Sequence, residues 1–240
     1  MWRGKKVSII FPTYNEKESI YKAINDFFAC GYVDEIVVVN NNAAEGTSEE
    51  VKKTKAREVF EKKQGYGYAI MKGLKEAKGD LLIISEPDGT FAGDDVIKLL
   101  AYSDDFDVVF STRTTKNMIW EGANMGIFLK WGNWVIAKMI EVLFNTTTLT
   151  DVGGSMRLLS RKSLNKIQKY FTVGSSHFGP EVMLLVIIKK MKFIEVPVNY
   201  KRRVGESSVT GSKFKAFVLG LQMINIVIYY RLKSLFGLAK

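Results

Sequence analysis

Short apolar runs alternate with amphipathic stretches along the first half of the chain. The runs at 7–12, 35–40, 57–60, 80–85 and 106–111 predict strands. The run from Glu35 to Asn40 is continuously apolar and β-branched from Ile36 to Val39, which indicates a strand buried on both faces. Helical patterns lie between the runs and are expected to begin near Glu16, at Thr47 or Ser48 as N-cap, and near Tyr68 and Asp94. Repeated strand–helix units predict an α/β fold with a doubly wound, mostly parallel sheet flanked by helices.

The second half of the chain is more helical. A largely helical stretch is expected at 120–145, an apolar helix at 180–190, and a strand at 193–198 that leads to a basic loop. The segment 151–160 predicts a strand or turn before another helix. The tail from Phe214 to Tyr230 is nearly uncharged but somewhat shorter than the roughly 20 apolar residues of a membrane span. We therefore expect one domain at 1–211 and a C-terminal apolar or amphipathic helix at 212–240, docked on the domain or lying in a membrane interface.

Composition narrows the class of protein and of partner. With 240 residues, 47% of them hydrophobic, the chain is long and apolar enough to bury a domain core. The net charge of +10 suggests an anionic partner, such as nucleic acid, a phosphorylated small molecule or an anionic membrane face; a merely solvated basic surface is an equal alternative. The single cysteine, Cys30, excludes an internal disulfide framework and fits a reducing compartment. Pro12 interrupts the first apolar run, which therefore reads as a strand and not as a signal peptide.

Polar clusters follow the predicted strands, at the point where each strand ends. They read "PTYNE", "NNNAAEGT", "EPDGTF" and "STRTT". Because ligands bind beyond the carboxyl ends of parallel strands, these clusters predict a site at one edge of the sheet. In "SEPDGTF", Glu86 and Asp88 stand two residues apart on a turn that Pro87 and Gly89 favour. By itself this stretch fits an ordinary acidic turn as well as a metal site.

Three common cofactor sites are excluded or weak. No G-x-x-x-x-G-K-[ST] stretch is present, so the chain has no P-loop. Gly65 and Gly67 are followed by Ile70 where a dinucleotide-binding turn needs a third small residue. One histidine and one cysteine cannot supply a zinc site of the usual kind.

Four motifs in order resemble the family 2 glycosyltransferases with the GT-A fold, and in particular the dolichol-phosphate mannose synthase-like branch that uses polyprenyl phosphates. "FPTYNE" resembles the opening motif, and "EIVVVNNNAAEGT" resembles the family's V-V-D-D-G-S-x-D-G-T. "QGYGYAIMKGLKEAKGD" resembles a third nucleotide-contacting stretch, and "EPDGTF" lies where the D-x-D metal motif belongs. The resemblance extends from Val7 to about Ser208.

The resemblance implies roles for named residues. Nucleotide-sugar binding is expected of Pro12, Tyr14, Glu16, Asn40, Asn41, Gln64, Gly67, Glu86 and Asp88. Mg²⁺ or Mn²⁺ would be held by Glu86, Asp88 and Thr90. Phosphate and acceptor binding is expected of Arg113, Arg157, Lys201, Arg202, Arg203 and Ser207. The catalytic set would be Asp88, Arg113, Asp151 and Arg203; Glu181 is a weak further candidate, and His177 is expected to be a surface or packing residue.

One departure from the family pattern affects the donor. Asn40 and Asn41 stand where the family has two acids, and an amide both donates and accepts hydrogen bonds. Nucleotide binding at this edge is still expected, but the base, uracil or guanine, is left open. The asparagines fit equally a turn that needs left-handed backbone geometry.

Three functions remain open on this basis. The first is inverting transfer of a hexose from a nucleotide-diphosphate sugar to a polyprenyl phosphate, whose oxygen is already anionic and needs little help from a base. The second is transfer to a sugar hydroxyl, for which Asp151 would have to serve as base. The third is a catalytically silent nucleotide-sugar-binding module, which the asparagines suggest. We expect the protein to be cytoplasmic, peripheral on an anionic membrane, and without a nucleic-acid partner.

Overall fold

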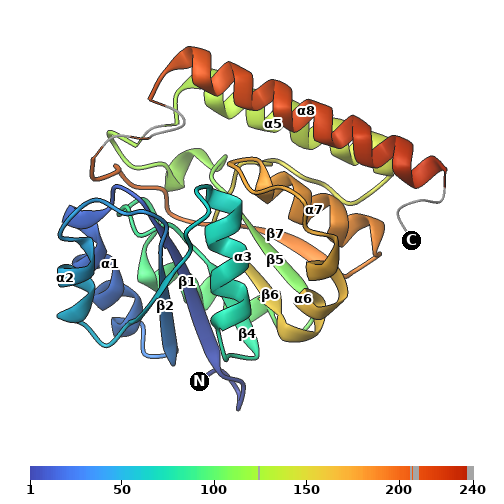
Figure 1. The fold of residues 1–240 in the computed structure, drawn as a ribbon. Coiled ribbons are helices and arrows are strands. Elements are labelled where there is room, and N and C mark those ends of the chain that lie inside the picture. The colour runs from blue at the N-terminus through green and yellow to red at the C-terminus, as the bar shows by residue number, and fades with distance from the viewer. Residues whose placement is uncertain (124, 206, 208–210, 237–240) are drawn as a thin grey trace.

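A mostly parallel sheet forms the centre of the fold. The computed structural model describes residues 1–123, 125–205, 207 and 211–236, and within them seven strands form one sheet in the order β3-β2-β1-β4-β6-β5-β7 (Figure 1). The strands are β1 (Val7–Thr13), β2 (Glu35–Asn40), β3 (Arg57–Phe60), β4 (Leu81–Ile84), β5 (Val108–Thr112), β6 (Arg157–Ser160) and β7 (Phe193–Pro197). β6 runs antiparallel to β4 and β5, and the other pairs are parallel. The predicted fold class is confirmed; the antiparallel strand was not anticipated.

Helices cover both faces of the sheet because its central strands are apolar on both sides. The helices are α1 (Lys17–Ala29), α2 (Thr47–Lys52), α3 (Tyr66–Glu76), α4 (Val96–Tyr102), α5 (Ile127–Phe144), α6 (Arg161–Ile167), α7 (Phe178–Ile188) and α8 (Lys213–Leu235), with short 3₁₀ turns at Gly93–Asp95, Lys116–Met118 and Gln168–Tyr170. Alternate residues of β1 separate the two cores: Ile9 and Phe11 pack with α1 and α4, and Ile10 packs with α3. Both cores are anchored on the same strands, so the sheet edge is held rigidly.

α5 and α8, which we call the helix layer, lie side by side over the carboxyl ends of the parallel strands (Figure 1). One face of α8, carrying Met223, Ile226, Val227 and Tyr230, is buried against the domain. The Tyr230 hydroxyl donates to Glu181 at 2.9 Å. The C-terminal helix is therefore docked on the domain. Within the described ranges, no helix combines the length and the apolar character that crossing a bilayer requires.

Two predicted helix starts were wrong by one or two residues, and glycine is the reason in both cases. α2 is capped by Gly46 at φ 88°, and the Thr47 hydroxyl donates to the Ala44 carbonyl instead of capping the helix. α3 begins at Tyr66 directly after Gly65, whose φ is 148°. Glycine reaches these backbone angles at little cost, so the helices start where the glycines stand.

Candidate active site

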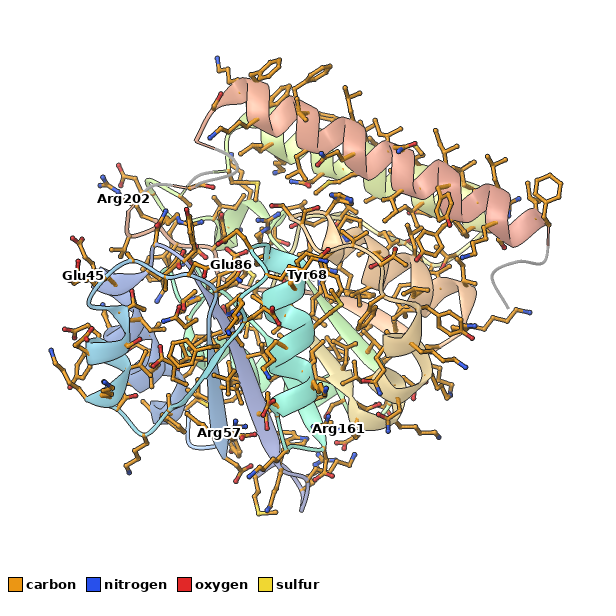
Figure 2. All side chains as sticks on the ribbon, viewed as in Figure 1. Glu45, Arg57, Tyr68, Glu86, Arg161 and Arg202 are labelled. Atoms are coloured by element: carbon orange, nitrogen blue, oxygen red, sulfur yellow. The ribbon has the colours of Figure 1, made fainter. Side chains whose placement is uncertain are left out.

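A cavity of about 820 Å³ lies between the carboxyl edge of the sheet and the helix layer. Figure 2 shows Glu86 at this end of the sheet and Arg57 and Arg161 at the opposite end. The predicted site residues that line the cavity are Pro12, Tyr14, Glu16, Asn41, Gln64, Glu86, Arg113, Arg157, Arg203 and Ser207. The remaining wall is largely apolar and comes from α5, α7 and α8. Residues from seven separate segments of the chain thus meet at one cavity.

The turn after β4 presents an acid whose two oxygens differ. Asp88 is fully buried, and its Oδ1 accepts from the Thr90 backbone N–H at 2.9 Å and from the Thr90 hydroxyl at 2.6 Å. Its Oδ2 is buried too and accepts no hydrogen bond from the part of the chain described here. A buried oxygen without a hydrogen-bond donor is an uncommon feature of a folded protein; Asp88 does not itself line the cavity, and this oxygen faces Arg203. Thr90 orients the carboxylate through the other oxygen.

Glu86 lies beside Asp88 on the same turn and is partly exposed to the cavity. Burial, and then the charge of Asp88, raise the pKa of Glu86 to about 7. Two carboxylates this close disfavour each other's charge, so the pair favours the arrival of a cation.

Arg203, from the basic loop after β7, provides a positive charge here. Its Nη1 lies 2.9 Å from Asp88 Oδ2 and 4.0 Å from Glu86 Oε2. Its Nη2 donates to Glu16 Oε1 at 3.1 Å. The loop is attached to the acidic turn through backbone hydrogen bonds from Val204 to Asp88 and from Lys201 to Thr90. The acidic turn and the basic loop thus form one unit.

Arg113, at the end of β5, is held by Asp151. The Asp151 carboxylate accepts from Arg113 Nε at 2.8 Å and Nη2 at 3.0 Å, and from the backbone N–H groups of Arg113 and Gly153 at 3.0 Å each. Burial raises the pKa of Asp151, but the charge and hydrogen bonds of Arg113 outweigh it and keep the pKa below its ordinary value. Asp151 is not part of the cavity wall, whereas Arg113 is. The geometry makes Asp151 the support of Arg113.

Arg157 is a second, deeper cation of the cavity wall. Its guanidinium donates to the backbone carbonyls of Gly154, Gly179 and Val152, and it lies over the ring of Phe110. Among the described residues it forms no ion pair with a carboxylate. Burial lowers the pKa of Arg157 to about 10, so the group stays charged near neutrality in surroundings that favour an added anion.

The side-chain amides of Asn40 and Asn41 form hydrogen bonds within the protein. Asn41 donates to the carbonyls of Glu61 and Lys63 and accepts from Gln64 Nε2 and the Gly65 N–H. Its whole hydrogen-bonding capacity is used, so its amide ties the loop after β2 to the loop after β3. Asn40 binds Ser48, Glu58 and the Ala43 N–H and lies outside the cavity wall.

Gly67 also serves packing. A Cβ on Gly67 would lie 2.2 Å from the Val173 carbonyl oxygen, and the Gly67 N–H itself donates to Gly174 O. The start of α3 is thus closed by the 173–174 backbone. Lys201 and Arg202 do not line the cavity either: Lys201 lies over the ring of Trp120 and the Arg202 side chain is exposed (Figure 2).

Three residues that the sequence pattern did not indicate also hold the cavity wall together. Tyr200 lines the cavity and lies beneath the Arg113 guanidinium, with 5.1 Å between the ring centre and Cζ. Glu195 in β7 accepts from the N–H groups of Thr150 and Asp151. Tyr66 lines the cavity, and burial together with the Glu86 charge raises the pKa of its hydroxyl. An acid within the strand "FIEVP" was the one available signal; the tyrosines gave none.

Glu181 and His177 lie at the start of α7. The buried Glu181 carboxylate accepts from the backbone N–H groups of Thr172 and Val173 in addition to Tyr230. It therefore joins α7 and α8 and has a structural task. His177 occupies the N-cap position, with its Nδ1 3.1 Å from the Ser175 hydroxyl.

Solved structures of low sequence identity share this fold, which is the GT-A fold. Glucosyl-3-phosphoglycerate synthase from Mycobacterium tuberculosis, solved with Mn²⁺, uridine diphosphate and phosphoglyceric acid, superposes with a TM-score of 0.76 at 15% identity, over 95% of this chain and 79% of that one. A further mycobacterial protein superposes with a TM-score of 0.76 at 15% identity, over 96% of this chain and 76% of its own.

The family follows from the sequence. Residues 8–168 match the model of glycosyl transferase family 2, and the chain belongs to that family. Two curated relatives come from Haloferax volcanii. A dolichyl-phosphate hexose transferase is 25% identical over 204 residues, 85% of this chain and 86% of the relative. The low-salt glycan biosynthesis hexosyltransferase Agl6 is 25% identical over 208 residues, but the chain spans only 49% of its length. The protein is a glycosyltransferase.

Proposed function

We propose that this enzyme transfers a hexose, with inversion, from a nucleotide-diphosphate sugar to a polyprenyl phosphate of the dolichyl type. The observation that carries the proposal is the continuity of one cavity, which joins the acidic turn and three arginines to an apolar wall from the helix layer. An acceptor with an anionic head and a hydrocarbon chain matches both parts. The similarity to the Haloferax dolichyl-phosphate hexose transferase supports the same substrate class.

The donor's diphosphate is proposed to bind with Mg²⁺ or Mn²⁺ at Asp88 and Glu86. Asp88 Oδ2, which accepts no hydrogen bond from the described residues and faces only the Arg203 cation, fits a hard cation. The described residues hold no cluster of His, Cys, Asp and Glu large enough to enclose a metal. The site therefore fits an ion that takes a few protein oxygens and completes its shell with substrate phosphates and water. Such an ion would neutralise charge on the leaving diphosphate.

On the acceptor side, Arg113 and Arg157 are proposed to hold the polyprenyl phosphate. A phosphate oxygen attacks the anomeric carbon as the bond from that carbon to the diphosphate oxygen breaks, and the diphosphate leaves with the electron pair. The attacking oxygen is already anionic, so no proton has to be removed. The residues' tasks are to position the phosphate and to stabilise charge.

Transfer to a sugar hydroxyl is the second candidate, and the geometry of Asp151 disfavours it. A general base needs an oxygen within reach of the acceptor's proton. Asp151 lies behind Arg113, and its oxygens already accept the hydrogen bonds of Arg113 and Gly153. A catalytically silent binding module was suggested by the two asparagines. Asn40 and Asn41 hydrogen-bond to the protein itself and leave the acidic turn unaltered, so they no longer argue for it.

We further propose that the enzyme lies on the cytoplasmic face of an anionic membrane, with the helix layer as its contact surface. Exposed apolar residues on this layer are Ile127, Phe128, Trp131, Trp134, Val135 and Val142 of α5 and Phe214, Phe217, Leu221, Ile228, Leu232 and Leu235 of α8. On α8 they are spaced by three, four or seven residues, opposite the buried face, and Lys213, Lys215, Arg231 and Lys233 flank them. An apolar stripe between cations is typical of helices at an anionic interface.

The function is tested by a donor screen. UDP- and GDP-linked hexoses are incubated with the full chain, Mg²⁺ or Mn²⁺, and a short-chain polyprenyl phosphate, and lipid-linked sugar is measured. We expect product from at least one donor, and none when EDTA is added. Donor binding without transfer to any polyprenyl phosphate, but with transfer to a sugar hydroxyl, would establish the second candidate instead.

The membrane surface is tested by sedimentation with vesicles that contain phosphatidylglycerol. The triple variant Phe214→Ser, Phe217→Ser, Leu221→Ser should bind at least about 10-fold more weakly, because each buried side chain contributes about 1.5 kcal/mol or more. A matched variant changes exposed apolar residues elsewhere, Tyr21→Ser, Phe60→Ser, Ile97→Ser, and should bind normally. Equal vesicle binding of both variants would show that the helix layer is not the membrane contact surface.

A further inference from the structure

Arg203 occupies the place that the proposed metal ion needs. The Oδ1 of Asp88 is already committed to Thr90, so Oδ2 is the oxygen that remains for a cation. Arg203 Nη1 lies 2.9 Å from that oxygen. A metal ion binds carboxylate oxygen at about 2.0 to 2.6 Å, so a divalent ion and the guanidinium on this one buried oxygen would repel each other at close range.

The guanidinium is built into this place. The backbone N–H of Val204 donates to the Asp88 carbonyl at 2.8 Å, and that of Lys201 donates to the Thr90 carbonyl at 2.9 Å. These bonds fix the loop on both sides of Arg203 against the acidic turn. Glu16, from the end of β1, holds Nη2 from the opposite side. The Arg203 side chain is only 21% exposed, so water reaches little of its guanidinium group.

The contact with Asp88 is nevertheless incomplete. The separation of 2.9 Å is that of an ion pair, but the alignment does not make it a hydrogen bond. A buried charge pair of this kind has a poorer balance of desolvation and attraction than a fully hydrogen-bonded pair. It is therefore the pair at this edge that a better cation can replace.

We propose that Arg203 is the resident cation of the donor site in the free enzyme, and that it exchanges places with the divalent ion when the nucleotide sugar binds. This inference rests on the proposed metal site at Asp88. The donor's diphosphate supplies the anion that the displaced guanidinium then pairs with. The metal alone must break the Arg203 contacts without that compensation. Metal and nucleotide consequently bind with positive coupling, and Arg203 is the residue through which they are coupled.

The exchange is tested by Mn²⁺ titration of the full chain, with free Mn²⁺ measured by electron paramagnetic resonance, alone and with UDP or GDP. In the native enzyme Mn²⁺ alone should bind weakly and the matching nucleotide should tighten it. In Arg203→Gln, Mn²⁺ alone should bind about 10-fold more tightly, within the usual range of such coupling, and the nucleotide should add correspondingly less. Arg203→Lys, which keeps the charge, should restore weak binding of Mn²⁺ alone.

Arg202→Gln is the matched control, since it removes the same charge from the adjacent exposed residue and should change Mn²⁺ affinity less than twofold. Identical Mn²⁺ affinity and identical nucleotide coupling in the native enzyme and Arg203→Gln would overturn the exchange while leaving the metal site in place. Absence of Mn²⁺ binding from every variant, with and without nucleotide, would overturn the metal site itself and the exchange with it.

Discussion

Two aspartate–arginine pairs lie at the same edge of the sheet, and their geometry differs. Asp151 receives two side-chain hydrogen bonds from Arg113 and two from backbone N–H groups. Asp88 meets Arg203 at one oxygen that accepts no hydrogen bond from any residue described. Removing a partner from a completed network is costly, whereas an incomplete contact can be exchanged. The first pair therefore fixes an arginine in the cavity wall, and the second is the pair at which we propose that a ligand binds.

The largest expected effect is on transfer by Asp88→Ala. Loss of the free carboxylate oxygen removes the proposed metal ligand, and we expect the rate of transfer to fall about 1,000-fold, or about 4 kcal/mol of transition-state stabilisation. The fold should persist because Arg203 retains Glu16, but the thermal unfolding midpoint should fall by several degrees, since the buried Thr90 N–H and hydroxyl lose their acceptor. Glu45→Gln, an exposed acid of the loop after β2, is the control and should keep full activity (Figure 2). If the Asp88→Ala enzyme is fully active, Asp88 is not a metal ligand and the stretch is an ordinary turn.

Asp151→Asn should show the opposite balance. Breaking the buried pair leaves Arg113 without its counter-charge, so the free energy of unfolding should fall by about 3 kcal/mol. Transfer should fall only about 10- to 100-fold, because Arg113 remains but is less well oriented. Urea unfolding and steady-state kinetics measure the two effects. Complete loss of transfer at unchanged stability would identify Asp151 as a base and favour the sugar-hydroxyl acceptor.

The same pair predicts a pH dependence of stability. The pKa of Asp151 is lower in the folded protein than its ordinary value of 3.8, so near that pH the unfolded chain binds more protons. The stabilising contribution is therefore complete above pH 3.8 and is lost as the pH falls through the folded pKa. The difference in unfolding free energy between the native enzyme and Asp151→Asn should be constant from pH 5 to about 7 and shrink below about pH 4. An equal difference at pH 3 and pH 7 would show that charge has no part in it.

The sequence pattern predicted the sheet and the gathering of polar clusters at one edge, because strand period and strand-end polarity are local properties. Val7, Glu35 and Arg57 begin strands where the runs predicted them. The antiparallel direction of β6 was not predicted. It depends on pairing with β4 and β5, and no local sequence pattern encodes that pairing.

Roles of single residues were harder to predict than the edge itself. The motif around Gly67 predicted a nucleotide contact, but only the three-dimensional structure shows that the Val173 carbonyl fills that space. Asn41 matched a donor-binding position, yet its capacity is used by Glu61, Lys63 and their neighbours. Whether Asp88 and Asp151 are free or engaged likewise depends on partners far away in sequence. Residue type and spacing indicate which groups reach an edge, and packing decides which of them remain available.

The smallest expected effect concerns the apolar wall near Arg113 and Arg157. Gly132 of α5 and Gly220 of α8 line the cavity, and a Cβ on either would meet no atom within 4 Å. A glycine inside a helix costs about 1 kcal/mol relative to alanine, so packing gives no reason for these two. We expect that they keep room for the acceptor's chain.

Gly132→Leu and Gly220→Leu should therefore raise the KM for a long-chain polyprenyl phosphate about 10-fold, the equivalent of about two buried methylene groups, and change it less for a short chain. Nucleotide binding should not change, and the unfolding temperature should stay equal or rise. Asn225→Leu places the same side chain on the exposed side of α8 and should leave the KM unaltered. If both glycine variants keep the native KM for every chain length, the hydrocarbon chain takes another path, and Arg113 and Arg157 alone define the acceptor end.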